Sequence, residues 1–271
     1  MALKLFNSIT DAGPDDEGLI AISGSHGGIY PAGVASAVGL RAVLFNDAGI
    51  GFEQAGVGGV LALDSVGMAA AALNCQTCLI GSAQDGYDNG IVSFVNDTAR
   101  QLGVIAGMTA DQAAKVLEAA DQPAARMTPP AEAQKIAQPE RGPIHLLDSA
   151  SVVSPELNGE IIVTGSHGAL IGGDPARALK ANAHVAVFSD AGFGKNNIGV
   201  TRLAALLDKG VGAVTASHLS CRIGDASSIY DTGVISATNE LAELMGARAG
   251  MSVKAFMLAA IVSKRSAVLQ I

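Results

Sequence analysis

The sequence predicts an internally duplicated α/β protein, in which two homologous βα repeats with mainly parallel sheets pack about a pseudo-twofold axis. Three observations support this prediction. The tetrapeptide GSHG occurs at 24–27 and again at 165–168. Residues 47–108 match residues 190–251 at a constant shift of 143, with 24 identities in 62 positions and no gap. Short apolar runs that end at glycine alternate with helical stretches in both copies, which is typical of α/β sheets.

The domain organisation follows from the repeat. The first α/β repeat is predicted at residues 1–120, the second at 144–271, and a linker at 121–143. The linker is rich in Pro, Ala and Gln and has no apolar periodicity. Two homologous halves joined in this way usually pack about a pseudo-twofold axis.

The apolar runs predict the strands, and the residues around them predict the helices. Helices are expected from Pro31 in the first copy and from Pro175 in the second, with Asp174 as N-cap. Residues 90–103 and 233–246 are each predicted as one helix that ends at glycine. Buried strands rich in β-branched or small residues are predicted at residues 19–23, 41–45, 68–73, 160–164, 184–188 and 212–217.

Some polar residues are the same in both copies. Asp88 and Asp231 are expected to cap the helices that follow them, and Ser93 and Asn96 are expected on one helix face, as are their counterparts Ser236 and Asn239. A structural role in fastening loop to helix is the favoured interpretation.

Composition narrows the classes of partner. The 271 residues are 49% hydrophobic and 15% charged, with a formal net charge of −8 and scattered Lys and Arg, so no surface for nucleic acid is expected. No uncharged apolar run reaches the roughly 18–20 residues that span a bilayer, and we expect a cytoplasmic protein without membrane contact. Three cysteines do not suggest a disulfide framework. The low charge content favours a homo-oligomer.

Three repeated motifs follow predicted strands, where ligands bind in parallel α/β sheets. A glycine-rich turn with Ser and His donors suits a carboxylate or phosphate, so Ser25, His26, Ser166 and His167 are candidate substrate-binding residues. The alternative is a tight turn with a packing role. In the DAGxG motif, which occurs at 47–51 and at 190–194, Asp190 is a candidate catalytic residue, and the alternative is that it only accepts backbone N–H groups of its turn.

The cysteines suggest a specific mechanism. Cys78 and Cys221 occupy equivalent positions of the repeats. Opposed thiols on either side of a substrate are able to remove and return a proton on opposite faces of a carbon. This layout is similar in plan to that of the aspartate/glutamate racemases, although that family's cysteine signatures are absent. The alternative is that both are small buried thiols that fill space beside the sheet.

The second copy has gained polar residues on its motif loops. His218 is a candidate catalytic acid or base, and Lys195 and Arg222 would bring positive charge to an acidic substrate. Asp225 is a further candidate substrate-binding residue. The first copy has Phe52, Cys75, Leu79 and Ser82 at the positions of Lys195, His218, Arg222 and Asp225.

The function expected from these residues is that of a small-molecule metabolic enzyme with its active site between the repeats. It would bind an acidic metabolite and transfer a proton without a cofactor, as isomerases and racemases do. No metal site is expected, because neither HExxH nor paired CxxC motifs occur. Two alternatives stay open: a hydrolase with a Ser or Cys nucleophile at the same loops, and a non-catalytic ligand-binding or assembly protein.

Overall fold

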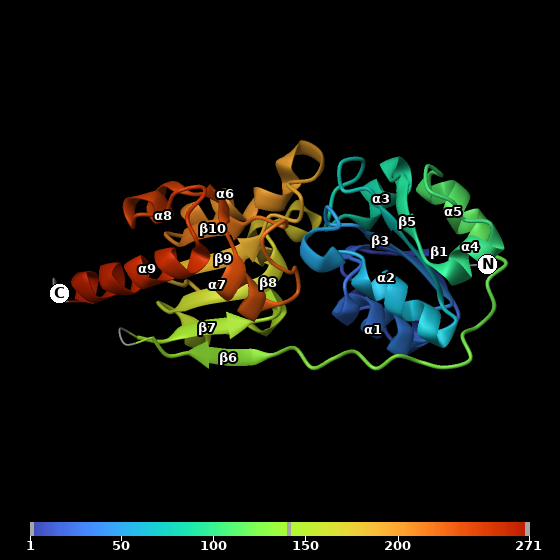
Figure 1. The fold of residues 1–271 in the computed structure, drawn as a ribbon, viewed down its shortest axis with the longest axis horizontal. Coiled ribbons are helices and arrows are strands. Elements are labelled where there is room, and N and C mark those ends of the chain that lie inside the picture. Colours follow the sequence, from blue (N-terminus) through green and yellow to red (C-terminus); the bar gives the residue numbers. More distant parts are fainter. Residues whose placement is uncertain (1–2, 140–141, 269–271) are drawn as a thin grey trace. The chain divides into compact units, whose positions relative to one another are not determined.

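The computed structural model describes residues 3–139 and 142–268 as a mixed α/β protein with two mostly parallel sheets (Figure 1). One sheet has five strands and the other has six, and nine α-helices lie in the described residues. The chain divides into two compact units. Unit 1 comprises Met1–Ala131, Ile171–Gly173 and Gly192–Ile198, and unit 2 comprises Glu132–Leu170, Asp174–Ala191 and Gly199–Ile271.

The sheet of unit 1 has the strand order β1-β2-β3-β4-β5. The first four strands are parallel, and β5 pairs antiparallel with β4. The two central strands β3 and β4 are buried along their whole length, which explains their continuous apolar sequence. The bounds are β1 Leu3–Phe6, β2 Ile20–His26, β3 Ala42–Asn46, β4 Ala69–Leu73 and β5 Val92–Val95.

Helices cover both faces of this sheet (Figure 1). Residues of α1 and α2 pack on one face with Phe45, and residues of α3, α4 and α5 pack on the other with Leu44. The alternation of Leu44 and Phe45 follows from the pleat, which sends successive side chains to opposite faces. The bounds are α1 Ile29–Val38, α2 Gly58–Ala62, α3 Ala83–Asn89, α4 Asp97–Leu102 and α5 Ala110–Leu117.

The sheet of unit 2 has the strand order β11-β10-β9-β8-β7-β6. Strands β7 to β10 are parallel, whereas β6 and β11 run antiparallel to their neighbours. Strand β6 lies inside the segment that the sequence predicted as linker. The bounds are β6 Gln134–Ala137, β7 Ile144–Leu147, β8 Ile161–His167, β9 Val185–Ser189, β10 Gly212–Ala216 and β11 Ile235–Thr238.

The helices of unit 2 also lie on both faces of its sheet. Residues of α7, α8 and α9 form one apolar cluster with the sheet, and α6 and the segment around Leu179 form the other. No helix in the described part of the chain is both long and apolar enough to cross a membrane. The bounds are α6 Arg202–Leu207, α7 Ala226–Thr232, α8 Glu240–Leu244 and α9 Val253–Val268.

All six predicted strands are confirmed, but two predicted helices are wrong. Residues 90–103 form strand β5 and then helix α4, because the side chain of Asn96 accepts the backbone N–H of Ala99 and begins a new helix there. Residues 233–246 divide in the same way at Asn239.

The expected roles of the polar residues shared by these segments change accordingly. Ser93 and Asn96 therefore do not share a helix face, and neither do Ser236 and Asn239. Asp88 and Asp231 lie within α3 and α7 instead of capping a following helix.

The helix predicted from Pro175 is only a short 3-10 helix, Pro175–Arg177. Asp174 caps it as expected, by accepting the backbone N–H of Ala176 at 2.9 Å. The parallel strands of the two sheets follow the same order along the chain. Internal duplication and the pseudo-twofold axis remain predictions from the sequence.

Candidate functional site

In each unit, the repeated motifs lie at the carboxyl ends of the parallel strands. In unit 2, His167 at the end of β8 is paired in register with Ser189 of β9, and Ser189 with Ala216 of β10. Asp190 directly follows β9, and His218 lies two residues after the end of β10. His167, Asp190 and His218 therefore lie at the same edge of the unit 2 sheet.

The glycines of GSHG are required by close backbone packing. A Cβ atom on Gly24 would lie 2.6 Å from the backbone N of Ser82 and 2.7 Å from the carbonyl O of Asn7. A Cβ atom on Gly165 would lie 2.4 Å from the carbonyl O of Asp148. These close contacts explain why glycine occurs at both positions, and no anion bound in the turn is needed for the explanation.

The serines of GSHG fasten neighbouring loops. Ser25 Oγ accepts the backbone N–H of Ile9 at 3.0 Å, and Ser166 Oγ accepts that of Ala150 at 2.9 Å. Both bonds tie the motif to the loop that follows the first parallel strand of its unit. The packing interpretation of GSHG therefore has direct support in both copies.

The histidines of GSHG are held in one tautomer. Nδ1 of His26 accepts the backbone N–H of Gly28 at 3.1 Å, and Nδ1 of His167 accepts that of Ala169 at 3.3 Å. An Nδ1 that accepts leaves the ring proton of the neutral imidazole on Nε2. Burial lowers the pKa of His26 to about 4, so this ring is neutral at pH 7.

Asp47 and the DAGxG loop of unit 1 form a strained turn. Oδ1 of Asp47 accepts the backbone N–H groups of Gly49 and Cys75, and Oδ2 accepts the hydroxyl of Ser93 at 2.7 Å. The four residues after Asp47 all have positive φ, with 62° at Ile50, which is unfavourable for a β-branched residue. Asp47 thus holds a costly backbone conformation in place.

Asp190 has a different partner in unit 2. Its Oδ1 accepts the backbone N–H of His218 at 2.9 Å and lies 3.0 Å from Nδ1 of the His218 ring. The side chain of Asp190 is 1% exposed and that of His218 is 20% exposed. Two residues that the sequence proposed as catalytic are therefore brought together, with the carboxylate buried and the imidazole reachable from solvent.

The three cysteines are buried and carry protonated thiols. Burial raises the pKa of Cys78 and of Cys221 to about 12. Burial and the charge of Asp47 raise the pKa of Cys75 to about 12 as well. Reactive cysteines have a pKa below that of a free thiol, so these environments are those of structural cysteines.

The charged candidates are engaged in ion pairs. Nζ of Lys195, which belongs to unit 1, lies 2.8 and 3.1 Å from the two carboxylate oxygens of Asp85. Nη2 of Arg222 lies 2.8 Å from Oδ2 of Asp225, and Oδ1 of Asp225 caps helix α7 by accepting the backbone N–H of Ser228. Asp225 is thus a residue that positions the Arg222 guanidinium.

The pKa of Asp225 reflects both of its contacts. Burial alone would raise the pKa of this carboxyl group. The backbone N–H of Ser228 and the Arg222 guanidinium outweigh burial and hold the pKa below its usual value.

Sequence reasoning missed several residues of these sites. Asp85, the partner of Lys195, differs between the copies and gave no signal. Asn96 and Asn239 are identical in both copies, and their burial as helix caps explains that identity. Among the described residues, no group of three or more His, Cys, Asp or Glu side chains is arranged to hold a metal ion.

The comparisons with known proteins add no family to this picture. No protein-family model matches the chain, and neither a curated protein nor a solved structure matches it.

Proposed function

We propose that this chain is an enzyme that transfers a proton on a small acidic metabolite, with His218 as the base and Asp190 as the carboxylate that orients it. The observation that carries the proposal is the 3.0 Å contact between Nδ1 of His218 and Oδ1 of the buried Asp190. General acid–base catalysis uses histidine more often than any other side chain.

The contact determines which ring nitrogen is available. An ionised carboxylate only accepts hydrogen bonds, so Nδ1 of His218 carries the proton and donates it to Asp190. Nε2 then carries the lone pair that accepts a proton from a substrate. Because Asp190 also accepts the backbone N–H of the same residue, the carboxylate fixes the ring orientation before a substrate binds.

A positively charged side chain supports the proposal of an acidic substrate. Arg222 lies four residues after His218, its side chain is 42% exposed, and Asp225 pairs with its guanidinium. A planar guanidinium is well suited to a carboxylate or phosphate. His167 and Ser166 lie at the end of the neighbouring strand and line the same edge of the unit 2 sheet.

The thiols are assigned a smaller role than the sequence suggested. A thiol with a pKa near 12 is a poor base and a poor nucleophile at pH 7, because the thiolate is the reactive form. We therefore place the proton transfer on His218 and not on Cys78 and Cys221. The same argument disfavours a hydrolase with a cysteine nucleophile.

The non-catalytic alternative has one observation in its favour, since the GSHG glycines and serines are explained by packing alone. A binding or assembly protein would need no base with an exposed ring. Internal duplication, homo-oligomer formation and a cytoplasmic location are parts of this proposal that the composition and the repeat support.

The proposal is tested by hydrogen exchange in heavy water. We expect the wild-type chain to catalyse loss of the C–H signal next to the carboxylate in one class of a panel of 2-amino, 2-hydroxy, 2-oxo and 3-oxo acids, followed by NMR. His218→Gln should slow this exchange by at least about 100-fold. His145→Gln is the matched control, because His145 lies in β7 near Glu160 and should leave the rate unchanged.

Absence of exchange across the whole panel would refute the proton-transfer proposal and favour the non-catalytic alternative. Equal rates in His218→Gln and wild type would show that another group is the base.

A further inference from the structure

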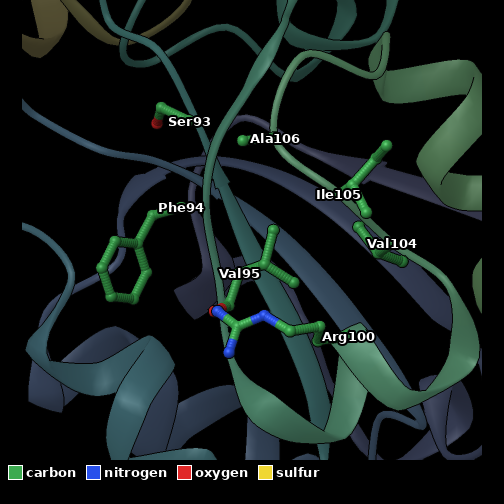
Figure 2. A pocket seen from close by; sticks show the side chains of 7 residues that line it. All are labelled: Ser93, Phe94, Val95, Arg100, Val104, Ile105 and Ala106. Carbon is green, nitrogen blue, oxygen red and sulfur yellow. The ribbon is translucent and has the colours of Figure 1, made fainter.

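A pocket of about 240 Å³ lies on unit 1 beside the edge strand β5 (Figure 2). Its lining comes from β5, from Arg100 of α4 and from the segment that follows α4. Pockets that take drug-sized ligands usually measure roughly 300–1,000 Å³. This pocket therefore suits only a small molecule.

The side chain of Arg100 brings a positive charge to this pocket. Nη2 of Arg100 donates to the carbonyl O of Val95 at 3.1 Å, and Nη1 lies 2.7 Å from Oδ1 of Asp97. Figure 2 shows the guanidinium beside Val95. The pair with Asp97 is exposed at both ends, 61% and 75%, so water screens it and it competes weakly with another anion.

Apolar side chains form part of the lining. Val95 and Val104 are buried, and Ile105 is 58% exposed. The hydroxyl of Ser93, the polar side chain from β5, already donates to Asp47. A ligand would therefore meet one guanidinium and a lining in which apolar side chains and polar atoms are both exposed.

The second copy differs at these positions. The shift of 143 places Glu243 at the position of Arg100, Thr238 at that of Val95 and Arg248 at that of Ile105. In unit 2 the hydroxyl of Thr238 donates to Glu243 Oε1 at 2.6 Å, and Arg248 donates to the backbone O of Glu243. The two copies thus share the helix-capping asparagine, which is Asn96 in the first copy and Asn239 in the second. They do not share the residues that line the pocket.

We propose that this pocket binds a small carboxylic acid with a short apolar chain, with its carboxylate on Arg100 and its chain against Val95 and Ile105. A guanidinium pairs a carboxylate through two parallel N–H donors, and the exposed side chain of Ile105 offers an apolar contact to a short alkyl chain that inorganic phosphate lacks. This binding site does not depend on the proton transfer assigned to unit 2.

The test is an NMR titration of the full ¹⁵N-labelled chain with isovalerate, with isovaleramide as the neutral probe of nearly the same shape. Saturable shifts are expected at the amides around Val95, Arg100 and Ile105, and isovaleramide should bind at least about ten-fold more weakly. Arg100→Gln should weaken isovalerate binding by at least about ten-fold. Arg126→Gln, which changes an exposed arginine paired with Glu17, should leave it unchanged.

Ile105→Gln provides a second variant that keeps Arg100 and alters an exposed side chain, and it should weaken isovalerate binding severalfold. The proposal is overturned if no saturable shift occurs up to about 20 mM isovalerate. Equal binding of the amide, or full binding by folded Arg100→Gln, would equally overturn it.

Discussion

The Nδ1 atom of His218 lies 3.0 Å from Oδ1 of Asp190, and the same oxygen accepts the backbone N–H of His218 at 2.9 Å. Two contacts from one residue to one carboxylate oxygen restrict both the loop and the ring. In the aligned position of the first copy, Cys75 donates its backbone N–H to Asp47 but has a thiol in place of the ring. The backbone contact is thus common to the copies, and the base occurs in the second.

The thiols should be unreactive in the folded protein. All three cysteines are buried and have a pKa of about 12, so at pH 8 only about one thiol in ten thousand is ionised. Labelling with Ellman's reagent should be at least about 100-fold slower in the native chain than in urea, where all three thiols react. Rapid labelling of native Cys78 or Cys221 would restore the two-thiol mechanism.

Gly24→Ala should prevent stable folding. The added methyl group would meet the backbone of Ser82 and Asn7, which cannot move aside as a flexible side chain does. The free energy of unfolding from urea titration should fall by more than about 3 kcal/mol. Gly13→Ala is the matched control, because nothing lies within 4 Å of its Cβ, and its change should stay within about 1 kcal/mol. A normally stable Gly24→Ala would argue against the packing role of GSHG.

Asn96→Ala should lower the free energy of unfolding by more than the loss of an ordinary helix cap does. Oδ1 of Asn96 accepts the backbone N–H groups of Ala70 and Ala99, and Nδ2 donates to the carbonyl O of Met68. Because the side chain is 1% exposed, we expect a loss of about 2–4 kcal/mol. Ser82→Ala, which removes only the cap of α3, should lose about 1 kcal/mol by the same urea measurement. Similar losses in both variants would contradict the bridging role of Asn96.

His26 should make the protein less stable in mild acid. Its pKa is lowered to about 4 in the folded chain from 6.5, so the unfolded chain binds more protons between these values. The protonation of His26 has no effect on stability well above pH 6.5, and the free energy of unfolding falls as the pH drops from 6.5 to 4, by about 3 kcal/mol in all. Urea titrations at several pH values should show a shallower pH dependence for His26→Gln. Parallel pH profiles of the two proteins would exclude this effect.

The strands were predictable because buried parallel strands leave a continuous apolar run, as in residues 42–45 and 185–188. The division of residues 90–103 into β5 and α4 was not, because a four-residue strand is too short to show a period. Its signal was Asn96, a polar residue that is shared by both copies and buried in the structure. A shared polar residue near a strand end is therefore better interpreted as a cap than as part of a helix face.

The sequence predicted which residues belong to the site but not how they contact one another. His218 and Asp190 were both identified, but they are 28 residues apart, and their contact depends on the register between β9 and β10. The protonation of the thiols depends on how deeply they are buried. The equivalent positions of Cys78 and Cys221 in the two repeats do not reveal that burial. The pocket beside β5 was missed because it exists only where α4 and the following segment return to the edge strand.

The most direct test of the account is the location of the proton on the His218 ring, measured by long-range ¹H–¹⁵N NMR of the full chain at a pH where the ring is neutral. The proposed role of Asp190 predicts a proton on Nδ1 and a lone pair on Nε2, and a change in this tautomer in Asp190→Asn, together with a loss of about 100-fold or more in any exchange activity. A proton on Nε2 in the wild-type chain would contradict this role, because the lone pair of the ring would then lie on Nδ1, against Asp190, and Nε2 would have none to accept a proton from a substrate.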